Sequence, residues 1–411
     1  LLQHALFVAH DDVRGVQVQQ PLEAVVTVDH PAVQIVQVGG REAAAVEGEK
    51  GRKGRGEERG RKGRRERRRR ERRKKEEGGR RGEEGERKRV KGSTGVQPIA
   101  IGHRVVHGGE KFKQAALVDE SVLKAIEDYA SMAPLHNMAN LKGIITAQEA
   151  YPDLPHVAVF DTSFFQTLPK KAFIYALPMS LYREHGIRRY GFHGTSHKFI
   201  LDSMAKILEK PVSQTSIISA HLGNGCSVSA IEKGQAVDTS LGFIPLEGLV
   251  MGTRCGDLDP SLPGTLQKKL GKTVDEISDL LNKQSGLLGI SELSNDCRTL
   301  EDAAGEGHEG ALLAIEIFCY RLAKYIAGYM VAVPTLDAIV FTGGIGENSS
   351  LIRETTMGYF AHFGIRLDEQ RNTDARFGQG GKISTDTAST AVYVVPTNEE
   401  WVIAAEAATF A

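Results

Sequence analysis

From Gln97 to Ala411 the sequence alternates short apolar runs with longer segments of helical periodicity, and this alternation constrains the fold more than any other feature. The apolar runs lie at residues 157–160, 216–220, 338–341 and 391–395, and the helix-like segments at residues 121–132, 196–208 and 310–333. Strands that alternate with helices in this way are typical of α/β proteins with largely buried sheets. The sequence therefore predicts an α/β fold.

Two glycine-rich turns follow apolar runs of this kind. The turn HLGNG at residues 221–225 separates run 216–220 from an alternating segment at residues 226–231, which predicts a β-hairpin. The turn GGIG at residues 343–346 follows a second run and precedes a helix start. Glycine lets backbone N–H groups converge on phosphate oxygens. The first turn could equally be an ordinary Asn-Gly hairpin turn.

Length and composition indicate a protein with substantial cores. The chain has 411 residues, enough for two or three domains, and no apolar run approaches the ~20 residues that cross a bilayer. Its four cysteines lie far apart, unlike those of a secreted disulfide scaffold. These features favour reduced thiols, a cytoplasmic location and no membrane partner.

The charge is divided unevenly along the chain. Lys50 to Lys91 hold 23 lysines and arginines against 9 glutamates, although the whole sequence has a net charge of zero. Residues 47–92 consist almost wholly of Arg, Lys, Glu and Gly, so this basic segment is predicted to be disordered. It could bind nucleic acid through counterion release. Because no aromatic residues interleave for base stacking, a solvated low-complexity segment is the better interpretation.

Five charged or titratable residues interrupt apolar or turn-forming sequence. They are Arg104, Asp161, His193, Arg254 and Glu399. Each one alone could simply meet water or a structural partner. Together with two glycine-rich turns they supply what phosphoryl transfer needs, because arginines neutralise phosphate charge and carboxylates hold Mg²⁺.

The sequence around these residues resembles the acetokinase family, within the sugar kinase, Hsp70 and actin superfamily. The resemblance covers roughly three quarters of the chain and runs through HRVVHGGE, APLHN, FDTSF, RRYGFHGTSH, HLGNGCS, DTSLGFIPLEGLVMGTRCGDLDP, FTGGIGEN and PTNEE. It implies reversible, Mg²⁺-dependent transfer of the γ-phosphoryl group of ATP to acetate, which gives acetyl phosphate and ADP. It also implies a homodimer.

The resemblance also implies a two-lobed, actin-like ATPase fold with ribonuclease H-like lobes. Residues 97–161, completed by 397–411, would form what remains of the first lobe. Residues 162–396 would form the second lobe, which binds nucleotide and mediates dimerisation. Residues 1–96 match nothing in the family.

Site residues follow from the matching motifs. Arg104 and Arg254 would hold the acetate carboxylate and the phosphoryl group in transfer. His193 would hydrogen-bond phosphoryl oxygens, and Asp161 would act beside acetate and metal as proton donor or acceptor. Glu399 would hold Mg²⁺.

The same motifs imply the two binding pockets. The pocket for the acetate methyl group would consist of Val106, Leu135, Phe192 and Pro245. ATP would be held by His221, Leu222, Gly223, Asn224, Gly225, Asp296, Cys297, Arg298, Gly344, Ile345, Gly346, Glu347 and Asn348.

The chain departs from the family before Gln97. Family members begin with a strand and a turn of the type N-x-G-S-S-S-x-K, which supplies an Asn for metal and a Lys and a Ser for phosphates, and residues 1–96 contain no such motif. We expect an incomplete first lobe with unpaired sheet edges. Either the coding start or an exon is mis-assigned, or the chain is an inactive relative that at most binds nucleotide. The low-complexity character of residues 47–92 favours mis-assignment.

Overall fold

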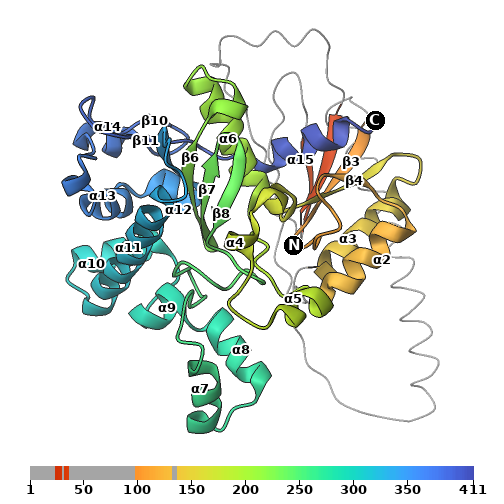
Figure 1. The fold of residues 1–411 in the computed structure, drawn as a ribbon, viewed down its shortest axis with the longest axis horizontal. Helices are drawn as coiled ribbons and strands as arrows, with labels where there is room; N and C mark the ends of the chain where they lie inside the picture. Colours follow the sequence, from red (N-terminus) through yellow and green to blue (C-terminus); the bar gives the residue numbers. More distant parts are fainter. Residues whose placement is uncertain (1–23, 30–31, 37–97, 132–136) are drawn as a thin grey trace, which may run out of the picture.

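The computed structural model describes residues 24–29, 32–36, 98–131 and 137–411, which form two β-sheets flanked by helices (Figure 1). The α/β prediction is confirmed. The basic segment at residues 47–92 lies outside the described residues, so its predicted disorder stays a prediction. Among the described helices, none combines the length and the apolar character that crossing a bilayer requires.

The first sheet contains five strands. Their spatial order is β2 (Ala32–Val36), β1 (Ala24–Asp29), β3 (Pro98–Val105), β5 (His156–Phe160) and β4 (Ala116–Leu117). Strand β3 runs parallel to both β1 and β5. The prediction that this sheet keeps unpaired edges is therefore wrong at β3, because β1 hydrogen-bonds along its free side.

Helices cover both faces of this first sheet. Helix α15 (Glu399–Ala408) packs Ile403, Ala404 and Ala407 against β3 and β5 on one face. On the other face, α2 (Glu120–Asp128) and α3 (Asn137–Ala150) enclose Val105 and Phe160. Figure 1 shows α15, the last helix of the chain, lying beside β3. This packing places Glu399, at the start of α15, next to the carboxyl end of β3.

The second sheet contains six strands. Their order is β10 (Gly381–Lys382), β11 (Ala391–Val394), β9 (Ala338–Thr342), β6 (Ile217–Leu222), β7 (Cys226–Glu232) and β8 (Gln235–Thr239). Strands β6, β9 and β11 are parallel. Strands β6 and β7 pair antiparallel with Leu222 opposite Cys226, so the predicted hairpin around residues 221–225 is confirmed.

Both faces of the second sheet are also buried. The main hydrophobic core lies under α11 (Glu309–Met330), with contributions from α9 (Gly286–Ser291), α10 (Cys297–Gly305) and α13 (Ser350–Gly358). The opposite face is covered by α6 (Gly194–Ile207), which packs Ile200, Leu201 and Met204 on β6 and β9.

The remaining described elements are short. They are η1 (Tyr129–Ser131), η2 (Ser163–Thr167), α4 (Lys170–Phe173), α5 (Met179–His185), η3 (Val212–Gln214), α7 (Leu262–Leu270), α8 (Val274–Lys283), α12 (Gly343–Asn348), η4 (Ala361–Phe363) and α14 (Glu369–Asp374). One of them corrects the sequence analysis: α12 begins at Gly343 itself, so residues 343–348 are helical rather than an open turn. Ser349 caps the next helix, α13.

Gly102 on β3 sets how closely α15 approaches the first sheet. A Cβ atom at this position would lie 2.6 Å from Ile403 Cγ2 and 3.3 Å from Ala407 Cβ. We expect Gly102→Ala to push α15 outward and to lower the free energy of unfolding by about 1–3 kcal/mol. Urea denaturation measures this. Gly328→Ala in α11, where a Cβ meets no atom within 4 Å, is the matched control. An unchanged unfolding midpoint for Gly102→Ala would contradict the packing.

A stacked histidine pair lies within the first sheet. His103 Nε2 and His156 Nδ1 are 2.9 Å apart, and the rings stack with centroids 5.1 Å apart. His156 Nε2 lies 3.0 Å from the Tyr151 carbonyl oxygen and donates to it, so its Nδ1 accepts from His103. Burial, together with the repulsion from a proton on His156, lowers the pKa of His103 to about 3, and burial also lowers the pKa of His156. Both rings are therefore neutral in the folded protein near neutral pH.

This pair makes the fold sensitive to acid. Below its ordinary pKa of 6.5, His103 takes up a proton in the unfolded chain but stays neutral in the folded chain until about pH 3. Stability is therefore fully present above that ordinary pKa and falls as the pH decreases. We expect His103→Phe to reduce the slope of unfolding free energy against pH, between about pH 4 and 6, by about 1.4 kcal/mol per pH unit. The control is His362→Phe, at an exposed histidine, and equal slopes for both variants would refute the assignment.

Candidate active site

Arg104 joins strand β3 to the end of β5 and to the start of helix α15 through two carboxylates. Its Nε donates to Asp161 Oδ1 at 3.0 Å, and its Nη2 donates to Asp161 Oδ2 at 2.9 Å. The same Nη2 lies 3.4 Å from Glu399 Oε2, which also accepts a 2.9 Å hydrogen bond from Thr195. Arg104 is on β3, Asp161 follows β5 and Glu399 begins α15, so the three predicted residues do come together.

His193 is held in an unusual backbone conformation at the start of α6. Its φ of 59° and ψ of 28° lie in the left-handed region, which costs a residue other than glycine about 1–2 kcal/mol. The following residue must be glycine, because a Cβ at Gly194 would lie 2.2 Å from the Asp161 carbonyl oxygen. That oxygen accepts a 3.0 Å hydrogen bond from the Gly194 backbone N–H. This hydrogen bond fixes the start of α6 to the end of β5, so it also fixes the position of His193 relative to Asp161.

The turn at residues 223–225 lies beside two of the predicted catalytic residues. A Cβ at Gly225 would lie 3.4 Å from His193 Nε2 and 3.4 Å from Arg254 Nη1. The ring of His221 lies 4.4 Å from that of His193, centroid to centroid. The structure thus brings His193, His221 and Arg254 around one glycine turn.

Burial and neighbouring charge keep these histidines neutral. Burial, His221 and the positive Arg104 hold the pKa of His193 well below its ordinary value. Burial also lowers the pKa of His221, although Glu399 opposes the effect. Burial alone would raise the pKa of Glu399, but Arg104 and His221 lower it overall, so this carboxylate is ionised.

Arg254 has no acidic partner in the described part of the chain. Its Nη1 donates to the Pro245 carbonyl oxygen at 3.0 Å and lies 4.0 Å from Met251 Sδ. Burial lowers its pKa, yet a guanidinium remains charged at neutral pH. A partly buried cation without a carboxylate favours an anionic ligand.

Three of the four predicted methyl-pocket residues are described. Val106 packs against the core cluster that contains the buried Phe192, and Pro245 lies beside Arg254. Asn140 accepts a 3.2 Å hydrogen bond from the Val106 backbone N–H, which positions the end of β3. Leu135 lies outside the described residues, so its role stays a prediction.

Some of the residues predicted to hold ATP turn into the core, and others lie at the surface. Leu222 and Cys297 turn their side chains into the core, so only their backbones could face a ligand. Asp296 caps α10 and holds Arg298 through a 2.7 Å ion pair at the surface. Asn224 Oδ1 accepts from Asn295 at 3.0 Å, an amide that sequence reasoning missed.

Helix α12, which contains the other predicted ATP residues, is anchored from inside the protein. Glu347 accepts from the backbone N–H groups of Gly343 at 2.9 Å and Thr397 at 3.0 Å. The fully buried Arg353 donates to the Gly346 carbonyl oxygen at 2.9 Å. Asn348 donates to the Gly344 carbonyl oxygen at 2.9 Å, while Ile345 packs against the core. Glu347 therefore holds the helix, and the exposed Gly344 is left on its surface.

Comparison with known proteins identifies the family of this chain. A model of the acetokinase family matches residues 87–405, so the match begins somewhat before Gln97, the start expected from the motifs. The acetate kinase of Shewanella pealeana is 63% identical over 308 residues, which is 75% of this chain and 77% of that protein. The chain belongs to the acetokinase family.

Solved structures of family members have the same fold. The structure of Porphyromonas gingivalis acetate kinase is 44% identical with a TM-score of 0.72 and covers 76% of this chain and 78% of that chain. A propionate kinase from Francisella tularensis is 47% identical with a TM-score of 0.72, covering 75% of this chain and 78% of that chain. The predicted actin-like ATPase fold is confirmed, and acetokinases are phosphotransferases.

Several polar residues of this acetokinase site were missed by the sequence analysis. Thr195 binds Glu399, and Ser196 Oγ bridges His221 Nδ1 and Thr397 Oγ1, at 2.8 Å to each. Ser227 lies 2.9 Å from His193 Nδ1. A signal was available, because serines and threonines recur inside segments otherwise patterned for burial.

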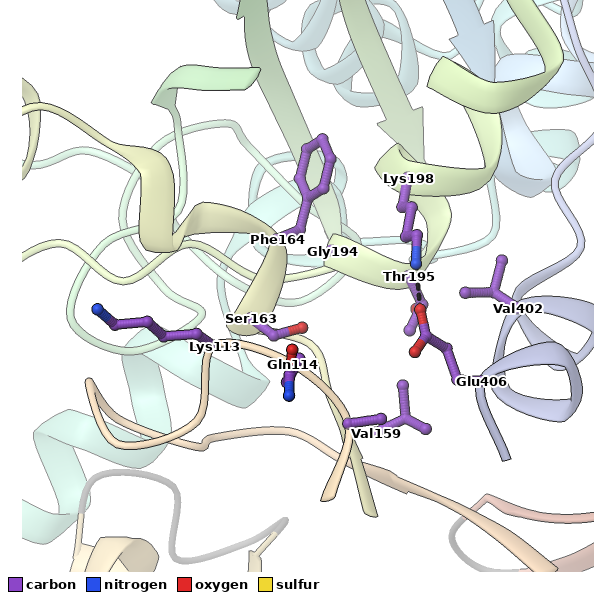
Figure 2. Close-up of a pocket in the computed structure, with 11 residues that line it drawn as sticks. Lys113, Gln114, Val159, Ser163, Phe164, Gly194, Thr195, Lys198, Val402 and Glu406 are labelled. Carbon is purple, nitrogen blue, oxygen red and sulfur yellow. Dashed lines mark hydrogen bonds and ion pairs between the residues drawn. The ribbon is translucent and has the colours of Figure 1, made fainter. Parts of the chain in front are cut away.

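A cavity of about 200 Å³ is lined in part by Thr195, whose hydroxyl donates to Glu399. Figure 2 shows Thr195, Lys198 and Glu406 on its wall, with a dashed line for the ion pair between Lys198 and Glu406. Its other lining residues include Ser163 and Val402. Thr195 therefore belongs both to the cavity wall and to the hydrogen bond that positions Glu399.

Gly225 offers a direct test of the anion site. An added methyl group would occupy the space between His193 Nε2 and Arg254 Nη1 while meeting no atom closer than 3.4 Å. We expect Gly225→Ala to weaken ATP binding, measured by calorimetry, about tenfold or more, which corresponds to ~1.4 kcal/mol. Its melting temperature should match that of the unmodified chain. Unchanged ATP affinity would place the phosphates elsewhere.

Proposed function

We propose that this acetokinase transfers the γ-phosphoryl group of ATP reversibly to acetate, forming acetyl phosphate and ADP. The observation that carries the proposal is the Arg254 guanidinium, which lacks an acidic partner among the described residues and lies with His193 Nε2 at the Gly225 turn. Two donors around a bare glycine backbone suit a phosphoryl group. The names of the similar proteins support acetate as acceptor.

The residues would act by positioning and by neutralising charge. An acetate oxygen attacks the γ-phosphorus and forms a new P–O bond, while the bond to the ADP oxygen breaks. Arg104 and Arg254 would offset repulsion between the anionic acceptor and the anionic phosphate. Because both oxygens of Asp161 accept from Arg104, we assign Asp161 to holding that guanidinium in place.

Mg²⁺ is the cofactor that we propose for this site. The ionised Glu399 offers hard oxygen ligands, which suit Mg²⁺. No cluster of three or more His, Cys, Asp or Glu within residues 98–131 and 137–411 could hold a metal alone. Mg²⁺ commonly binds through one or two carboxylates, phosphate oxygens and water, so Glu399 fits this mode. The ion would neutralise phosphate charge when bound.

The apolar residues near the end of β3 support a small carboxylate as acceptor. Val106, Phe192 and Pro245 would exclude long acyl chains by contact. One extra methylene changes binding by only about 1–3 kcal/mol, so propionate should serve as a poorer substrate. The propionate kinase among the similar structures agrees with this tolerance.

The lobe boundaries given by the sequence stay a proposal. Packing of α15 against β3 supports assigning residues 397–411 to the first lobe with residues 97–161, which leaves residues 162–396 to the second. Assembly as a homodimer and a cytoplasmic location also stay predictions.

The proposal is tested by trapping acetyl phosphate with hydroxylamine. We expect the full chain with ATP, acetate and Mg²⁺ to form acetyl hydroxamate, and EDTA to abolish the product. Arg254→Ala and His193→Ala should each lower kcat about 100- to 1000-fold with the fold intact, because each removes a donor to the transferring group. Arg371→Ala, which removes a surface ion pair with Asp386, is the control.

Two results would contradict the proposal. ATP binding by calorimetry without any hydroxamate would identify the chain as a nucleotide-binding relative that lacks the activity. Full activity in Arg254→Ala would show that the partly buried guanidinium does not contact the reacting phosphate.

A further inference from the structure

A line of hydrogen bonds connects His193 to the interior of the second sheet. Ser219 Oγ lies 3.0 Å from His197 Nδ1, His197 Nε2 lies 2.7 Å from Ser227 Oγ, and Ser227 Oγ lies 2.9 Å from His193 Nδ1. Ser219, Ser227 and His197 are all fully buried. Residues of β6, α6 and β7 therefore form a relay that ends at the predicted catalytic histidine.

Each member of this relay has few protons to share. A neutral imidazole carries one N–H, and a serine hydroxyl can donate one hydrogen bond. Burial and His221 hold the pKa of His197 well below its ordinary value, so this ring is neutral, as is His193. All donors in the line must then point the same way, either from Ser219 toward His193 or the reverse.

The far end of the relay decides its direction. Among the described residues, the Ser219 hydroxyl has one hydrogen-bond partner, His197 Nδ1. If Ser219 accepted from His197, its own proton would point into the core without an acceptor, which costs about 1–3 kcal/mol. Ser219 therefore donates to His197, His197 Nε2–H donates to Ser227, and Ser227 donates to His193 Nδ1.

We propose that Ser227 is a positioning residue that holds His193 as the Nε2–H tautomer, so that this nitrogen donates to the phosphoryl group. The inference rests on the function proposed above. His193 Nε2 is the ring nitrogen that lies at the Gly225 turn near Arg254 Nη1. With the other tautomer, a lone pair at Nε2 would face the anionic oxygens and repel them.

The test compares two serines of β7 that are equally buried. Ser227→Ala removes the hydroxyl that binds His193, whereas Ser229→Ala removes a hydroxyl that lies 3.2 Å from Thr239 Oγ1 and forms no hydrogen bond with a histidine among the described residues. In the hydroxamate assay we expect Ser227→Ala to lower kcat about 10- to 100-fold, with KM for acetate changed less than about twofold. Ser229→Ala should keep kcat within about twofold of the unmodified chain.

Nitrogen-15 NMR of labelled histidine reads the tautomer directly, because protonated and unprotonated ring nitrogens have different shifts. We expect His193 to be protonated at Nε2 in the unmodified chain and in Ser229→Ala, and to shift toward the Nδ1–H form in Ser227→Ala. The His193→Asn spectrum assigns the signals. Ser219→Ala, at the other end of the relay, should cause a smaller shift in the same direction and serves if Ser227→Ala fails to fold.

The kcat measurement and the tautomer measurement together distinguish failure of this inference from failure of the proposed function. An active enzyme whose His193 tautomer is the same in Ser227→Ala and Ser219→Ala would overturn the relay. A chain that makes no acetyl phosphate, but whose tautomer follows Ser227, would refute the proposed reaction and support the relay. Equal loss of kcat in Ser227→Ala and Ser229→Ala would reduce Ser227 to a packing role.

Discussion

The pairing of Arg104 with two carboxylates is the interaction on which the site depends. Its guanidinium binds Asp161 through two nitrogens and reaches Glu399 with one of them. A planar, always charged fork suits this double contact in a way that the single ammonium of lysine would not. Because Asp161 follows β5 and Glu399 starts α15, one side chain fixes the ends of three elements that lie far apart in sequence.

Helix α6, which packs on the second sheet, positions His193 in the site. The N–H of Gly194 bonds to the Asp161 carbonyl oxygen, so α6 starts where β5 ends, and His193 must adopt a left-handed conformation between them. A strained residue of this kind persists only when its surroundings determine it fully, and such residues are concentrated at functional sites. The hydrogen bond from Ser227 on β7 is one of the contacts that hold His193 in this conformation. Contacts between the first sheet and α6 therefore bring Asp161 and Glu399 to the glycine turn at residues 223–225.

The sequence predicted the helices and strands better than it predicted which residues contact one another. Period and glycine content located β6, β7, β9 and α11, because those segments are buried and strongly patterned. The same reasoning could not show that Cys297 turns inward while Asp296 caps its helix, since both depend on the exact rotation of α10. It also missed Ser227, because a buried serine becomes informative only when the histidine across the strand is known. The β1–β3 pairing was missed because parallel partners distant in sequence leave no local pattern.

The neutral state of His193 follows first from its burial in this arrangement and then from the positive groups around it. His193 Nε2 and Arg254 Nη1 both lie 3.4 Å from one point, so they can be no more than about 7 Å apart. Two positive charges at that separation repel by about 2 kcal/mol at an effective dielectric constant of 20. Arg104 adds to this repulsion. The site therefore concentrates positive charge on its two arginines and uses the imidazole as a dipole. A neutral ring can donate from only one nitrogen, so its tautomer decides whether it attracts or repels an anion. The buried hydroxyl of Ser227, which bonds to Nδ1, can therefore determine whether Nε2 donates to an anionic ligand.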